Sequence, residues 1–125
     1  MSRLAEVSSW ELDKVVVTGL ELLACEFQEE KRLGVLFLKA RGSELDADRI
    51  DQIAEAIDAH VYDWATCDIL AGGVLRRAIE GDESLVPQLM EWSSAENLWR
   101  RRACCVSFLS FARKGIHAEI GRAHV

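Results

Sequence analysis

Three charged residues, Arg32, Asp68 and Arg102, recur along this chain at nearly constant spacing, and this repetition constrains the fold more than any other feature. They lie 36 and 34 residues apart, and apolar or small residues follow each of them: Leu33-Gly34-Val35-Leu36, Ile69-Leu70-Ala71-Gly72 and Ala103-Cys104-Cys105-Val106. A period of about 35 residues is typical of proteins in which helix pairs stack and each pair buries its apolar face on the next. The sequence therefore predicts stacked helix pairs with the three charged residues adjacent on one surface.

Apolar residues recur at helical spacing in three segments, residues 10–41, 46–80 and 84–113, and no stretch shows a convincing two-residue alternation. Residues that stop or cap helices separate the predicted elements: Arg41-Gly42 and Gly81 as stops, and Ser43 or Asp46, Ser84 and the capping box Ser93-Ser94-Ala95-Glu96 as caps. The predicted fold is all-α, a short α-solenoid of three HEAT-like helix pairs over these ranges, with the second helices lining one concave surface.

Two adjacent glycines, Gly72 and Gly73, fall inside the predicted helix from Asp63 to Ile79. Each costs about 1 kcal/mol in a helix relative to alanine. We expect a neighbouring helix to approach closely at this point, because only glycine would then leave enough room.

The net charge of −6 argues against a nucleic-acid partner at first, because Lys and Arg must supply phosphate contacts. The charge is unevenly distributed, however. Residues 1–63 hold 14 acidic and 7 basic side chains, whereas residues 64–125 hold 7 acidic and 8 basic ones. The basic residues of the second half are clustered, at Arg76-Arg77, Arg100-Arg101-Arg102 and Arg113-Lys114. One basic face on an acidic protein is therefore compatible with DNA binding.

The four cysteines show neither the CxxC spacing of zinc or redox sites nor the density of a disulfide framework. They are interpreted as small apolar residues in a reducing compartment. No apolar run approaches the roughly 20 residues that cross a bilayer, and no signal pattern opens the chain. We therefore expect a cytoplasmic protein that does not bind membranes.

Two motifs carry a resemblance to a known family. Trp64 and Asp68 lie in the sequence Trp-Ala-Thr-Cys-Asp, and Asn97-Leu98-Trp99-Arg100-Arg101-Arg102-Ala103 follows after about one repeat. In this order and at this separation they resemble the AlkD-like DNA alkylation repair family, which consists of HEAT-like repeat DNA glycosylases. The resemblance covers about residues 29–115.

The resemblance implies a monofunctional glycosylase of base excision repair. Such an enzyme hydrolyses the N-glycosidic bond of N3- or N7-alkylated purines in duplex DNA, without a metal or cofactor and without flipping the base into a pocket. It also implies that Asp68 is the catalytic carboxylate, that Trp64 contacts the deoxyribose of the lesion and that Arg102 binds the DNA backbone. Arg101, Trp99 and Arg32 are further candidates for DNA binding. No obligate protein partner is evident, and the parent protein is expected to be monomeric.

The chemistry of this reaction suits these residue types. An alkylated purine is a cationic leaving group, and the sugar gains oxocarbenium character as the bond breaks. A fixed carboxylate such as that of Asp68 stabilises this charge and positions water. The indole of Trp64 adds cation–π attraction, and the guanidinium of Arg102 offers paired donors to phosphate oxygens.

Two other interpretations remain open. The charges at 32, 68 and 102 can instead form an ion-pair ladder that fixes the register of the repeats, with Trp64 and Trp99 as core or cap residues. The chain is then a non-catalytic HEAT-like scaffold that binds DNA or a protein partner. A third interpretation is an unrelated helical bundle, in which the repeat is a coincidence.

Both ends of the chain depart from the family. Family members are longer, with further helices before residue 10 and a C-terminal part that contributes another aromatic residue at the lesion. The last six residues, 120–125, look like the translation of a sequencing adapter. From the sequence we expect residues 1–119 to be a truncated HEAT-like fragment that is inactive alone, followed by a non-native tail.

Overall fold

The computed structural model describes residues 10–123 and, within the last helix, side chains up to residue 113. The helices in chain order are α2 (Leu12–Leu23), α3 (Gln28–Ala40), η1 (Gly42–Glu44), α4 (Ala47–His60), α5 (Trp64–Ile69), η2 (Leu70–Leu75), α6 (Arg76–Gly81), η3 (Glu83–Leu85), α7 (Val86–Met90), η4 (Glu91–Ser94) and α8 (Leu98–Ala123). No strand occurs in this part of the chain. The all-α prediction is confirmed.

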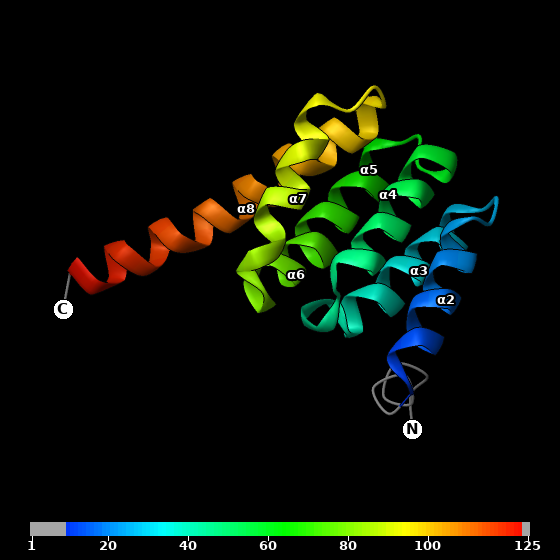
Figure 1. Ribbon diagram of the computed structural model, residues 1–125, viewed down its shortest axis with the longest axis horizontal. Coiled ribbons are helices and arrows are strands. Elements are labelled where there is room, and N and C mark those ends of the chain that lie inside the picture. Colours follow the sequence, from blue (N-terminus) through cyan, green and yellow to red (C-terminus); the bar gives the residue numbers. More distant parts are fainter. Residues whose placement is uncertain (1–9, 124–125) are drawn as a thin grey trace.

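Successive helix pairs lie side by side along the molecule (Figure 1). α2 packs against α3 within the first pair, and it also contacts α4 of the next. α3 contacts α5 and η2, and α8 contacts α5, η2 and α6. The second helices of the three predicted pairs are therefore neighbours. This order is compatible with a short solenoid.

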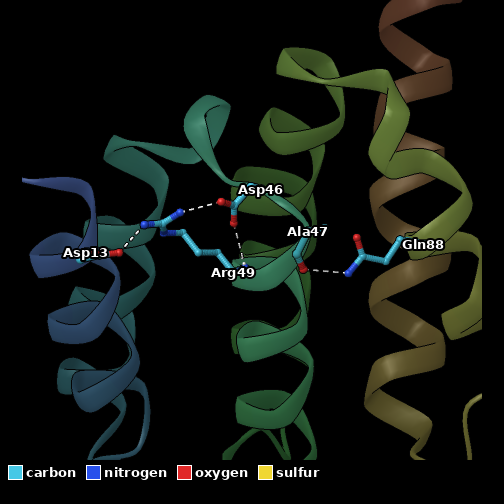
Figure 2. Close-up of polar contacts among 5 residues, drawn as sticks. All are labelled: Asp13, Asp46, Ala47, Arg49 and Gln88. Carbon is cyan, nitrogen blue, oxygen red and sulfur yellow. Dashed lines mark hydrogen bonds and ion pairs between the residues drawn. The ribbon is translucent and has the colours of Figure 1, made fainter.

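Polar contacts join the first helices of the successive pairs (Figure 2). Arg49 near the start of α4 binds Asp46 and reaches Asp13 of α2. On the other side of α4, the amide nitrogen of Gln88 in α7 donates to the Ala47 carbonyl at 2.9 Å and to the Asp51 carboxylate at 2.8 Å. The amino-terminal turn of α4 is thereby fixed to both of its neighbours.

Side-chain caps mark the starts of α4, α5, η3 and α8, and two of the predicted caps are wrong. Asp46 caps α4, as one of the two predicted alternatives, because its carboxylate accepts from the backbone nitrogen of Arg49 at 3.1 Å. Ser84 is not a cap, since Asp82 accepts from its backbone nitrogen instead. The box Ser93–Glu96 does not open the last helix. Asn97 does so, accepting from the Arg100 nitrogen at 3.0 Å.

The close helix approach expected at Gly72 and Gly73 is found instead at Gly19 and Gly34, between α2 and α3. A Cβ atom added to Gly34 would lie 2.6 Å from the Gly19 carbonyl oxygen, so close that the helices would have to shift. Added to Gly72 or Gly73, it would meet nothing nearer than 3.5 Å, an ordinary contact. Glycine at 72 and 73 is therefore not required by packing.

Among the described residues, the most buried charged side chain is that of Lys31, which is 1% exposed at the start of α3. Its Nζ donates to the Leu23 carbonyl and to the His60 carbonyl, both at 2.8 Å, and lies 4.9 Å from the centre of the Tyr62 ring. Leu23 and His60 are the last residues of α2 and α4, whose C-terminal ends carry partial negative charge. Lys31 thus joins three helices at one end of the stack.

None of the helices that the structure describes is both long enough and apolar enough to cross a membrane.

Replacement of Lys31 by methionine should destabilise the fold by about 2–4 kcal/mol, because two buried carbonyls lose their donor. Urea unfolding followed by circular dichroism measures the change. Lys39→Met on the same helix is the matched control, since Lys39 is only partly buried, and it should stay within about 0.5 kcal/mol of the wild type. Equal effects of the two substitutions would contradict the role given to Lys31.

Candidate functional site

The continuous helical segment from Trp64 to Gly81 exposes one face. Pairs of buried residues alternate along it with pairs that remain accessible: Trp64-Ala65, Asp68-Ile69, Gly72-Gly73, Arg76-Arg77 and Glu80-Gly81. Its middle, η2, is a π-helical turn. An aromatic ring, a carboxylate, two glycines and two guanidiniums therefore follow one another along a single surface.

The start of this segment is held by α3. Asp63 caps α5, accepting from the Thr66 backbone nitrogen at 2.9 Å. The side-chain amide of Gln28 bridges the same turn, donating to Asp63 at 3.3 Å and accepting from the Thr66 hydroxyl at 3.2 Å. Burial opposes ionisation of Asp63, but the hydrogen bonds from Thr66 and Gln28 outweigh it and lower the pKa of this carboxyl. Trp64 follows directly and is 67% exposed.

Asp68 and Arg102 form a paired contact between α5 and α8. Nε of Arg102 donates to one carboxylate oxygen of Asp68 at 2.8 Å, and a terminal nitrogen donates to the other at 2.9 Å. The hydrogen bond to Asp68 raises the pKa of Arg102 above its usual value. Both side chains remain more than one-third exposed, so that solvent and a ligand can reach the pair.

Trp64 completes this cluster. The guanidinium carbon of Arg102 lies 5.0 Å from the centre of its indole ring, within the range of a cation–π contact. Arg102 therefore contacts both the carboxylate and the ring. The structure brings together the three residues to which the sequence assigns the main roles.

A shallow pocket of about 380 Å³ opens beside this cluster, lined by Trp64, Leu98, Trp99, Arg101, Arg102 and Cys105. Trp99 is partly buried, and it packs against the core while one side reaches the pocket. Most of the lining is apolar, and it suits a flat or alkyl group more than a phosphate.

The remaining candidates differ in their surroundings. Arg101 is exposed and donates to the carbonyls of Ala95 and Glu96 at 2.7 and 3.1 Å. Arg32 is exposed on α3, and its side chain forms no contact with Asp68 among the described residues. Only the Asp68–Arg102 half of the predicted ladder is thus present in the described residues. Arg100 is turned away from the cluster to Asp58 of α4.

Sequence reasoning did not single out Gln28 and Asp63. Asp63 lies directly before a helical segment, which is a recognisable cap signal. Gln28 carries no such signal, since its partner is 35 residues away. Among the described residues, no group of three or more His, Cys, Asp or Glu side chains could hold a metal ion.

The family model described as "DNA alkylation repair enzyme" matches residues 4–123 of the chain. No curated protein and no solved structure matches it in the corresponding comparisons.

The thiols beside the cluster should differ in reactivity. Burial raises the pKa of Cys67 to about 12, so that at pH 8 it remains a protonated, unreactive thiol, whereas Cys105 is exposed. Iodoacetamide should therefore modify Cys105 quickly in the native protein and Cys67 only after unfolding, as peptide mass spectrometry can show. Cys105→Ser should abolish the fast reaction at this site. Equal native labelling of Cys67 and Cys105 would contradict the described burial.

Proposed function

The chain belongs to the DNA alkylation repair enzyme family, and from this premise we propose that its parent protein is a DNA glycosylase acting on N3- or N7-alkylated purines in duplex DNA. The family supports a role in DNA alkylation repair. The reaction and the lesion are our inference. The observation that carries the proposal is the contact of Asp68, Arg102 and Trp64 on one accessible face.

In this proposal Asp68 is the electrostatic catalyst. The alkylated purine leaves with its positive charge neutralised, while the deoxyribose becomes cationic at its anomeric carbon. The carboxylate of Asp68 stabilises that developing charge and orients the attacking water. The exposed ring of Trp64 lies one helical turn before Asp68 and adds attraction to the same cationic sugar.

Arg102 has two roles in this mechanism. Without DNA, its paired donors neutralise Asp68 and keep the carboxylate in a fixed orientation. A phosphate of the bound strand competes for the same guanidinium, because phosphate oxygens also accept paired donors. Transfer of Arg102 from Asp68 to a phosphate would free the carboxylate for the sugar only once DNA is in place.

The same contact also supports the second candidate, a non-catalytic scaffold that binds DNA or a protein partner. Both carboxylate oxygens of Asp68 are occupied by Arg102, as expected of an ion pair that fixes the register of neighbouring helices. The glycosylase and the scaffold differ in the expected effect of removing the negative charge of Asp68. Only in the glycosylase should this change slow the release of alkylated base.

In the complete parent protein, Asp68→Asn should slow the release of 7-methylguanine from methylated duplex DNA by roughly two to three orders of magnitude, the usual effect of losing one electrostatic stabiliser. Free base is quantified by chromatography and mass spectrometry. Asp58→Asn is the matched control, because Asp58 also pairs with an arginine of α8, Arg100, away from the cluster. It should release base at the wild-type rate. An equal effect of both substitutions would favour the scaffold.

Trp64→Ala should slow base release by about 2- to 30-fold, corresponding to the 0.5–2 kcal/mol of a cation–π contact. Trp64→Phe keeps a smaller π face, and its rate of base release should lie between those of the wild type and Trp64→Ala. Since Trp64 is exposed, the thermal midpoint of unfolding should change little in either variant. A rate that is unchanged in Trp64→Ala would remove the ring from the mechanism.

A further inference from the structure

A second polar site lies on the same exposed face as Asp68, two helical turns further along. Arg76 and Arg77 occupy it, and they line a pocket of about 400 Å³ together with Ser43, Glu80 and Gly81. Eight residues of helix separate Asp68 from Arg76, a span of about 12 Å. Three to four base-pair steps of DNA cover the same length at 3.4 Å per step.

The two guanidiniums are held in place by backbone carbonyls. Nε of Arg76 donates to the Gly72 carbonyl at 2.7 Å, and one terminal nitrogen donates to Glu80 at 2.8 Å. A terminal nitrogen of Arg77 donates to the Lys39 carbonyl at 3.3 Å. For the other donors of Arg77 the described residues provide no partner. Because Glu80 pairs with Arg76, Arg77 supplies positive charge that is not neutralised by an ion pair among these residues.

Between Asp68 and this pocket, Gly72 and Gly73 contribute no side chains to the accessible face. Packing does not explain these glycines, since an added Cβ would meet only Ser110 or Lys39, at 3.5 Å. They also lie in the π-helical turn η2, a rare conformation that is frequently found at functional sites. Glycines that helix packing does not need, and that weaken the helix, are expected where another backbone must come close.

We propose that the Arg76–Arg77 pocket binds a phosphodiester group of the substrate strand, and that the strand reaches it across the bare surface of Gly72 and Gly73. The inference rests on the proposed function, because it assumes that DNA lies along this face. It assigns to the pocket the placement of the strand, so that the alkylated nucleotide lies at Asp68. Ser43, which lines the pocket, offers a hydroxyl group as a further donor to phosphate.

The glycines provide a test in which stability and binding change in opposite directions. The double variant Gly72→Ala, Gly73→Ala should unfold at a temperature a few degrees higher, because alanine favours the helix and its Cβ has room. It should nevertheless bind a 20-base-pair duplex about tenfold more weakly, as fluorescence anisotropy can measure. Wild-type affinity in this variant would overturn the proposal.

Arg77 provides a second, independent test through the dependence of DNA affinity on salt concentration. Arg77→Gln should lower the slope of log Kd against log salt concentration by about 1, the change expected for one lost phosphate contact. Lys14→Gln on α2, an exposed residue on a first helix, is the matched control and should leave the slope unchanged. An unchanged slope in Arg77→Gln, or equal changes in both variants, would refute the phosphate site.

These binding experiments use undamaged duplex, so that their outcome is separate from catalysis. If the protein releases no alkylated base, but the glycine double variant loses affinity and Arg77→Gln lowers the salt-dependence slope as described, the phosphate site stands and the glycosylase proposal fails. If base is released at the wild-type rate and affinity is unchanged in both variants, the glycosylase proposal stands and the phosphate site fails.

Discussion

The contact between Asp68 and Arg102 is the interaction on which the proposed site depends. It joins α5 to α8 through two hydrogen bonds and places the guanidinium against the ring of Trp64. Because the pair is more than one-third exposed, solvent screens it and its contribution to stability is small. Its importance lies in geometry, since it fixes where a carboxylate, a cation and an indole meet on the surface.

Contacts at the start of α3 help to position this site. Lys31 holds the ends of α2 and α4, and Gln28, one turn earlier on α3, holds the first turn of α5. Trp64 is the first residue of that turn. The accessible face of the segment from α5 to α6 then carries, in order, the catalytic candidates, the glycine turn and the arginine pocket. One strand of DNA lying along this face would contact all of them in succession.

The sequence predicts the helices and the main cluster for simple physical reasons. The apolar spacing, Gly81 and the cap Asp46 are local signals, and the repeat brings Asp68 and Arg102 to neighbouring helices. Other features depend on contacts that local patterns do not encode. The residues at 93–96 match the capping-box motif, yet Asn97 is the N-cap of the last helix. Gln28 binds a partner 35 residues away, and the close approach of two helices occurs at Gly34, because the room for a Cβ is set by tertiary packing.

Residues 124 and 125 of the predicted non-native tail lie outside the described residues, as do the side chains of 120–123.

The most direct test of the proposed function is the incubation of the complete parent protein with duplex DNA that contains a single N7-methylguanine. The proposed function predicts free 7-methylguanine in solution and an abasic site at that position in the strand, with no added metal or cofactor. It would be contradicted if the protein bound this duplex and an undamaged one with equal affinity and released no base, which is the behaviour of a scaffold.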